Sequence, residues 1–403
     1  MKKRLIAIVL SVTFAFSMLP GVAFAADNPD VKPTQTPPTA QDYPASTSTQ
    51  TVEPKAKSAI LIDQDSGQVL YELNPDEVTA PASITKVMTM LLTMEAIEDG
   101  RIKLTDKVKT SQHAESMGGS QLWLEVGEEM TVDDLLKGVA VHSANDAAVC
   151  LAEHIAGTEG AFVEQMNKKA QALGMKSTKF VNCNGLDEDG HVTTARDVAT
   201  MSRELLKHEQ ITKYTKIWMD VLRDGKMQIV NTNRLIRFYE GATGLKTGTT
   251  DKAGVCVSAS AKRGNLHLIA VVMGAANSND RFQMAQNMLD YGFANYTSVQ
   301  PDISGVKLTP VKVLKGCEEQ VGIVAEKPSS VIVKKGDDKK IVQKVTLSPD
   351  VMAPVEKGQV LGKIVLTLDG KTIGECKLKA EKAVPKMSFG RAFALLLQLF
   401  TQM

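Results

Sequence analysis

Three short motifs carry side chains that together could perform nucleophilic catalysis. They are Ser83-Ile84-Thr85-Lys86, Ser143-Ala144-Asn145 and Lys246-Thr247-Gly248, in that order along the chain. A serine hydroxyl becomes an effective nucleophile when a neighbouring base accepts its proton, and a neutral lysine amine is such a base. The other two motifs supply a hydroxyl, an amide and a cation for proton relay and substrate binding. The set predicts covalent catalysis by a serine.

The first motif is the one whose spacing carries the most chemistry. Ser83 and Lys86 follow Pro81 at the start of a predicted helix, one turn apart, so the amine can reach the hydroxyl. A desolvated site near a second cation, Lys246, would keep the amine neutral. The amino end of the helix also offers free N–H groups for an oxyanion. We therefore expect Ser83 to be the nucleophile and Lys86 the base.

The second and third motifs each allow two interpretations. Ser143 and Asn145 suit a loop that presents both side chains to one cleft, but Ser and Asn also favour the N-cap of a following helix. Lys246-Thr247-Gly248 precedes a predicted strand hairpin, where Gly248 would let a substrate backbone approach closely. A surface turn is the alternative. Both interpretations of each motif stay open at this stage.

With their flanking residues, the motifs resemble the serine D-Ala-D-Ala carboxypeptidases of the low-molecular-mass penicillin-binding proteins, over roughly residues 58–403. The matching stretches are Pro81-Ala82-Ser83-Ile84-Thr85-Lys86, Ser143-Ala144-Asn145-Asp146-Ala147, Asn184-Gly185-Leu186-Asp187, Thr194-Ala195-Arg196-Asp197 and Gly244-Leu245-Lys246-Thr247-Gly248. The resemblance implies an α+β fold, with a β-lactamase/transpeptidase-like domain in which an antiparallel sheet packs with a helical cluster. It also implies peptidoglycan stem peptides and β-lactam antibiotics as ligands, and neither a cofactor nor a metal.

The resemblance further implies a role for each matching residue. The catalytic set is Ser83 as nucleophile, Lys86 as base and Ser143 as proton relay. The substrate-binding set is Asn145, Lys246, Thr247, Gly248, Thr249 and Arg281, with the backbone amides of Ser83 and Thr249 as the oxyanion hole. Arg281 would meet the terminal carboxylate of the substrate, and a solvated surface residue is the alternative. Thr249 stands where some members carry histidine, which bears on fine specificity.

Three other functions fit the sequence less well. A class A β-lactamase needs a water-activating glutamate, and the nearest candidate, Glu164, lies in an amphipathic helical run. A wall-binding protein without turnover would have no need of intact Ser83, Lys86 and Lys246. A metal-dependent peptidase would need paired histidines on a helix, which are not found; His142 beside Ser143 is interpreted as structural.

The elements that must position the motifs span residues 58–295. A hairpin is predicted from Ile60–Ile62 and Val69–Tyr71, followed by helices that include Val132 to Ala156 and Ala161 to Leu173. Strands Gly254 to Ala261 and Leu266 to Met273 and a last helix from about Asp280 to Tyr291 close the domain. Strands at both ends of a helical middle indicate one sheet built from the two ends of the domain.

Two further segments follow this domain. Residues 296–384 alternate short strands and turns, at Ser330 to Lys334, Lys340 to Leu347 and Gln359 to Leu368, which predicts a small all-β domain. Residues 385–403 predict an amphipathic helix on the membrane surface, too short in its apolar run to span a bilayer. Its apolar face carries Phe389, Phe393, Leu396, Leu397 and Phe400, opposite Arg391, Gln398 and Gln402. A helix docked on the β-domain is the alternative.

The amino-terminal residues predict an exported protein. Residues 1–25 have the cationic start, short apolar run and small-residue end of a cleaved signal peptide, the alternative being an uncleaved anchor. Residues 26–57 are proline-rich and polar, which predicts a disordered tether. Loss of Lys2, Lys3 and Arg4 would change the formal charge from +1 to −2, so the protein has no excess of basic residues that would indicate binding to nucleic acid.

The five scattered cysteines suit buried apolar positions. The expected location is the outer face of the cytoplasmic membrane and the cell wall.

Overall fold

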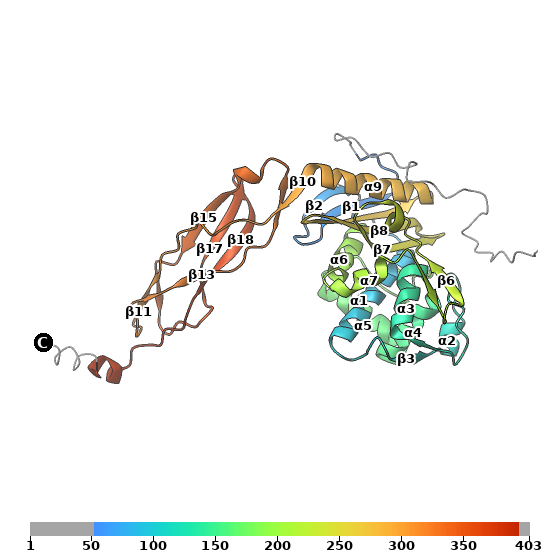
Figure 1. Cartoon of the computed structure of the whole chain (residues 1–403), viewed down its shortest axis with the longest axis horizontal. Coiled ribbons are helices and arrows are strands. Elements are labelled where there is room, and N and C mark those ends of the chain that lie inside the picture. The colour runs from blue at the N-terminus through green and yellow to red at the C-terminus, as the bar shows by residue number, and fades with distance from the viewer. Residues whose placement is uncertain (1–51, 395–403) are drawn as a thin grey trace, which may run out of the picture. The chain divides into compact units, whose positions relative to one another are not determined.

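The computed structural model of the chain describes residues 52–394 (Figure 1). The predicted signal peptide and most of the predicted tether lie outside the described residues. So do Leu396, Leu397 and Phe400 of the predicted amphipathic face, with Gln398 and Gln402 opposite them.

A five-stranded antiparallel sheet forms the centre of the first domain, in the order β2-β1-β9-β8-β7. Its strands are β1 (Ser58–Asp63), β2 (Val69–Leu73), β7 (Ala242–Thr250), β8 (Gly254–Arg263) and β9 (Leu266–Ala275). The predicted opening hairpin and the predicted later hairpin are both confirmed. Since β1 pairs along its whole length with β9, the prediction of one sheet built from both ends of the domain is also confirmed.

Each face of this sheet packs against helices, and β1 shows the division clearly. Ile60 and Ile62 belong to the hydrophobic core on the side of the helical cluster, whereas Ala59 and Leu61 face the core beneath α9 (Ser278–Asn295). Figure 1 shows α9 on one face and the cluster on the other. Because successive strand residues point to opposite faces, a strand covered on both sides is apolar throughout.

The helical cluster contains eight α-helices within the described residues. They are α1 (Lys86–Glu98), α2 (Gln112–Glu115), α3 (Val132–Lys137), α4 (Asn145–Ala156), α5 (Glu159–Ala172), α6 (Ala195–Leu205), α7 (Thr212–Thr215) and α8 (Leu235–Phe238). Two 3₁₀ turns, η2 (Ala82–Thr85) and η4 (Glu209–Ile211), and two small hairpins complete it, β3 (Lys107–Lys109) with β4 (Glu129–Thr131) and β5 (Met219–Leu222) with β6 (Met227–Val230). Thr158, Thr194 and Asn277 start α5, α6 and α9 by accepting a backbone N–H into the side-chain oxygen.

The helix predicted from Val132 to Ala156 is not continuous, so this prediction is wrong. After α3 the chain widens into a π-helical stretch, η3 (Gly138–His142), and Ser143 then takes a left-handed conformation with φ 67°. A left-handed residue ends a right-handed helix. The apolar spacing hid the break because residues on both sides of it are buried in the same core.

The end of the predicted tether also differs from expectation. Val52 is buried in the core beneath α9, and the backbone N–H of Lys55 donates to the Met284 sulfur of that helix. Residues 52–57 therefore belong to the folded domain. The contacts of this segment are with a helix far along the chain, which composition alone does not reveal.

Residues 296–384 form strands only, apart from one 3₁₀ turn, η5 (Asp338–Lys340), in the described chain. The strands are β10 (Tyr296–Val299), β11 (Val311–Leu314), β12 (Gln320–Val321), β13 (Ile323–Ala325), β14 (Val331–Lys334), β15 (Val342–Leu347), β16 (Asp350–Met352), β17 (Val360–Leu368) and β18 (Lys371–Ala380). The sheet β13-β18-β17-β15 carries one small core, and β12-β11-β16 contributes to a second. The predicted all-β character is confirmed.

The chain stays attached to this β-region beyond its last strand. Val384 is buried and bridges to Val355, and Met387 donates its backbone N–H to the Lys315 carbonyl. Residues 389–394 are helical, with Phe389 88% and Phe393 55% exposed. No described helix is both long enough and apolar enough to cross a membrane.

The contact between α9 and the sheet yields a prediction about two helical glycines. A Cβ added at Gly292 would lie 2.5 Å from Leu268 Cδ1, whereas one at Gly160 in α5 would meet nothing within 4 Å. Gly292→Ala should therefore lower the free energy of unfolding by about 1–3 kcal/mol, because the helix must move off the sheet. Gly160→Ala, the matched control, should raise it by about 0.5–1 kcal/mol. Urea unfolding measures both, and a stabilised Gly292→Ala would contradict the packing.

Candidate active site

The Lys86 amine lies where three separate segments of the chain meet. Its Nζ is 3.0 Å from Ser83 Oγ, 2.5 Å from Asn145 Oδ1 and 2.6 Å from the Asn184 carbonyl oxygen. Ser83 belongs to η2, directly before α1, so the predicted reach of one helical turn is confirmed. Asn145 is the first residue of α4, and Asn184 lies in the loop after α5.

Burial controls the charge of this amine. The side chain of Lys86 is fully buried, which lowers its pKa to about 7 against the attraction of Cys183 and Asp146. A neutral amine has two hydrogens and one lone pair. The oxygens of Asn145 and Asn184 can only accept, so both hydrogens go to them and the lone pair is left facing the Ser83 hydroxyl.

The orientation of the Asn145 amide is determined by a second contact. Its Nδ2 donates to the Gly118 carbonyl at 2.6 Å, which turns Oδ1 toward Lys86. The interpretation of Ser143 and Asn145 as helix caps is wrong, because the N-cap of α4 is Ala144 and no side chain caps it. Asn145 thus belongs to the site. The Ser143 hydroxyl lies at the left-handed turn before it and makes no hydrogen bond to another residue of the range 52–394.

Asp146, which the sequence interpretation assigned no role, fixes the loop beside this turn. Its fully buried carboxylate accepts the backbone N–H of Leu122 at 2.9 Å and that of Leu124 at 3.2 Å. The Asn145 N–H also donates to the Ser120 carbonyl at 2.7 Å. The segment 118–124 is therefore held by α4. The sequence shows an aspartate directly after the motif. Its partners are backbone N–H groups, which every residue type except proline has, so the sequence does not reveal which residues it binds.

Lys246-Thr247-Gly248 lies in the edge strand β7, and the alternative of a surface turn is wrong. Lys246 is 1% exposed and donates from Nζ to the Thr247 carbonyl at 3.0 Å. Burial places the pKa of Lys246 well below its usual range, and repulsion from Lys86 and Arg281 lowers it further. The amine of Lys246 therefore lies close enough to Lys86 to be repelled by it, although burial is the main cause of the lowered pKa of both residues.

Two glycines allow the turn that carries Ser83 to be enclosed. A Cβ at Gly248 would lie 3.0 Å from both the Ala82 Cβ and the Ser83 backbone nitrogen, and one at Gly185 would overlap the Ala82 carbonyl. At Gly248 the chain itself approaches closely, at the turn that carries Ser83, and the predicted approach of a substrate backbone stays a prediction. Gly185 follows Asn184, so the same loop both accepts from Lys86 and packs on this turn.

Arg281 and Thr249 stand together at the end of β7. Arg281, in the first turn of α9, is 8% exposed, and its Nη1 donates to the carbonyls of Gly248 and Cys256 at 3.3 Å and 3.2 Å. It also contacts Thr249 Oγ1 at 3.3 Å. The alternative of a solvated surface arginine is wrong. This guanidinium reaches the same strand end as the motif and is held there by backbone carbonyls.

Two residues weighed for other functions lie elsewhere. Glu164 is exposed on α5, in the helix that its spacing predicted. The His142 ring packs 6.3 Å from the ring of Trp123, and burial lowers its pKa, so a neutral imidazole next to Ser143 fits a structural residue. The arrangement contains a hydroxyl, a buried amine of lowered pKa beside it, and the buried side chains of Lys246 and Arg281 near one strand end. Such a site suits acyl transfer to serine.

Comparison with known proteins gives one consistent result. Residues 45–277 match the family described as D-alanyl-D-alanine carboxypeptidase, and residues 296–386 match the penicillin-binding protein 5 C-terminal domain. D-alanyl-D-alanine carboxypeptidase DacF of Bacillus subtilis is 48% identical over 83% of this chain and 87% of its own length. The solved structure of penicillin-binding protein 5 from Haemophilus influenzae is 33% identical, with a TM-score of 0.76 over 84% of this chain and 100% of that one. Penicillin-binding protein D2 from Listeria monocytogenes, solved in an ampicillin-bound form, is 31% identical over 60% of this chain and 100% of its own, with a TM-score of 0.56.

The lowered pKa of Lys86 predicts how stability depends on pH. An unfolded lysine keeps its proton up to a pKa of 10.5, whereas folded Lys86 loses it near 7, so the unfolded state binds more protons between these values. Stability should therefore rise with pH in this window, by about 1.4 kcal/mol per pH unit from this residue.

Urea unfolding of the wild type and of Lys86→Met at several pH values checks this prediction. The difference in unfolding free energy between the two should change with pH over the window, since other titrating groups are common to both proteins. A difference that is constant with pH would show that Lys86 keeps its ordinary pKa.

Proposed function

Because the chain belongs to the D-alanyl-D-alanine carboxypeptidase family of penicillin-binding proteins, we propose that it removes the terminal D-alanine of peptidoglycan pentapeptide stems through an acyl intermediate on Ser83. The observation that carries the proposal is the buried Lys86 amine, 3.0 Å from Ser83 Oγ, with its pKa lowered to about 7. At neutral pH a large fraction of this amine is ready to accept the serine proton.

In the proposed acylation, Ser83 Oγ attacks the carbonyl between the two D-alanines while its proton moves to Lys86. The carbonyl oxygen becomes an oxyanion, which the backbone amides of Ser83 and Thr249 would bind. The C–N bond then breaks, and the leaving amine takes a proton relayed through Ser143 and Lys86. Water repeats the sequence on the acyl-serine, with Lys86 again as base, and releases the shortened stem.

Substrate recognition follows from the charge at the strand end. The terminal carboxylate of the substrate would lie against Arg281 and Thr249, where a guanidinium can bind both oxygens. Lys246 would also attract this carboxylate. A bound carboxylate would offset the repulsion that Lys86 and Arg281 exert on Lys246. Asn145 would hold a substrate peptide group, and Thr247 and Gly248 shape the strand along which it lies. A β-lactam carries an amide and a carboxylate, so we propose the same residues for penicillin binding.

We also propose that the protein acts outside the cytoplasmic membrane, held there by its last residues. The peptidase domain would span residues 58–295 with the packed segment 52–57, and the β-domain residues 296–384. Support comes from the signal-peptide pattern of residues 1–25 and from Phe389 and Phe393, which are exposed on the helical residues 389–394. Peptidoglycan lies outside the membrane, so a helix in the membrane interface would keep the site near its substrate.

The proposed nucleophile is tested by Ser83→Ala. Loss of the only reacting hydroxyl should lower D-alanine release from a pentapeptide stem by at least about a thousandfold. Labelling by a fluorescent penicillin should disappear as well, because one serine forms both acyl intermediates. D-alanine assay, muropeptide analysis and gel fluorescence give the readouts. Ser329→Ala, an exposed serine of the β-domain, is the control and should match the wild type. Stoichiometric labelling of the Ser83→Ala protein would refute the assignment.

The membrane assignment is tested by removing the residues after Met387. This end point keeps Val384 in the β-domain core and the Met387 contact to Lys315. A chain from Ala26 to Met403 should sediment with lipid vesicles, and the shortened chain should lose at least about tenfold in partitioning, because each buried phenylalanine contributes about 1.5–3 kcal/mol. The full-length Phe389→Ser, Phe393→Ser variant should lose binding in the same direction. Equal sedimentation of all three proteins would refute the anchor.

A further inference from the structure

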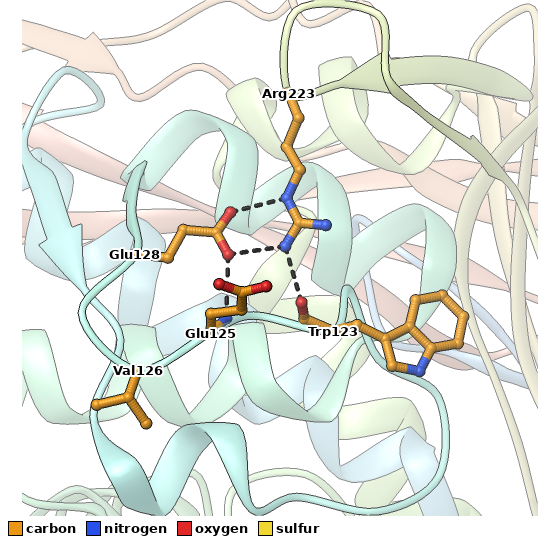
Figure 2. A pocket seen from close by; sticks show the side chains of 5 residues that line it. All are labelled: Trp123, Glu125, Val126, Glu128 and Arg223. Atoms are coloured by element: carbon orange, nitrogen blue, oxygen red, sulfur yellow. Dashed lines mark hydrogen bonds and ion pairs between the residues drawn. The ribbon is translucent and has the colours of Figure 1, made fainter.

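Two loops contribute to the surroundings of the Lys86 amine, and the first of them is held by an arginine. This loop, residues 118–124, is bonded from outside by Arg223, which donates to the Trp123 carbonyl at 3.0 Å and to both carboxylate oxygens of Glu128, at 2.7 Å and 2.9 Å. Figure 2 shows these bonds around one guanidinium. A charged side chain thus fixes the first loop, and the second loop has a charged partner of its own.

The second loop, residues 180–186, carries the carbonyl oxygen of Asn184, which accepts from Lys86 Nζ at 2.6 Å. The loop contains neither helix nor strand, so its shape depends on hydrogen bonds from side chains. A shift of the Asn184 carbonyl would leave one hydrogen of the neutral amine without an acceptor. The lone pair would then no longer be directed at Ser83.

Glu159, the first residue of α5, binds this loop one residue before Asn184. Its Oε1 accepts the backbone N–H of Cys183 at 2.9 Å, and its Oε2 lies 2.7 Å from His113 Nε2. The Glu159 side chain is 15% exposed. Burial alone would raise the pKa of this carboxyl, but the bonds to Cys183 and His113 hold its pKa below the ordinary value. Glu159 is therefore a carboxylate at neutral pH.

Other contacts attach the same loop to α1 and to the turn before it. The Cys183 carbonyl accepts from Thr89 Oγ1 at 2.5 Å, and the Val181 N–H donates to His191 Nδ1 at 2.9 Å. The proton of the imidazole is then on Nε2, which donates to Thr85 Oγ1 at 2.8 Å. Burial lowers the pKa of His191 to about 4, so the ring stays neutral and keeps this arrangement.

We propose that Glu159 is a positioning residue of the acylation reaction, which keeps the Asn184 carbonyl in contact with Lys86 Nζ through the Cys183 backbone N–H. The carbonyl takes one hydrogen of the amine and so leaves the lone pair directed at Ser83. The inference rests on the proposed function and adds to it a residue outside the three motifs. Because the group that Glu159 binds is a neutral N–H, the position of its oxygen should matter more than its charge.

Two substitutions separate position from charge. Glu159→Gln removes the charge and keeps an acceptor oxygen at the same distance along the side chain. Glu159→Asp keeps the charge at the amino end of α5, but the side chain is one methylene shorter, so its oxygen no longer reaches the Cys183 N–H. Glu164→Asp, at an exposed glutamate of the same helix, is the matched control.

The measurement is single-turnover acylation by a fluorescent penicillin. It gives the acylation rate constant and the penicillin concentration at half-maximal rate, and urea unfolding shows that each variant is folded. Glu159→Asp should lower the rate constant by about ten- to hundredfold, the loss expected when a catalytic group is displaced by about 1 Å. The half-maximal concentration should change little, because Glu159 does not contact the substrate. Glu159→Gln and Glu164→Asp should stay within about twofold of the wild type.

The pH dependence separates geometry from protonation. The loss in Glu159→Asp should persist at about pH 9, where Lys86, with its pKa of about 7, is neutral in both proteins. Recovery of the rate at that pH, an equal loss in Glu159→Gln, or a Glu159→Asp protein as fast as the wild type would overturn the positioning role alone. Penicillin labelling that persists in Ser83→Ala would instead refute the proposed function, and the inference with it.

Discussion

The removal of one lysine side chain from water is the constraint on which this site depends. A buried amine is costly unless its hydrogens are satisfied, and here they are satisfied by Asn145 and the Asn184 carbonyl. These acceptors come from α4 and from the loop after α5. Two segments far apart in the sequence thus place two oxygens around one nitrogen. In the neutral amine a lone pair is then left facing Ser83, so the same contacts that satisfy the buried amine also support the role of base proposed for Lys86.

Enclosure of the turn that carries Ser83 is the second requirement, and it is met by glycines, which have no side chain at the points of contact. The loop at Gly185 and the strand at Gly248 both press on the backbone around Ser83, in places where a Cβ would collide. Rigid contacts of this kind hold a reacting hydroxyl in one geometry. The same strand, β7, continues into Thr249 and its contact with Arg281. One edge strand, β7, thus contacts both the turn that carries Ser83 and the Arg281 guanidinium.

How far the sequence could predict this arrangement depends on how local each feature is. The contact of Ser83 with Lys86 follows from a spacing of three residues in a helical turn, and the sheet follows from alternation and turn residues. Asn184 and Asp146 could not be assigned, since their contacts involve backbone groups of distant segments. The break at Ser143 was hidden because buried residues continue on both sides of it. The packing of Val52 depends on a helix far along the chain.

The pairing of β1 with β9 has a consequence for how the molecule can be made. β1 lies inside the sheet, yet its neighbour β9 begins only at Leu266, after the whole helical cluster has been synthesised. A chain that emerges amino end first must keep this apolar strand from pairing wrongly until its partner arrives. Contacts so distant in sequence form slowly. β7, with Lys246, is linked to β1 in the sheet only through β8 and β9, so it joins the sheet that contains β1 only once these later strands have been made.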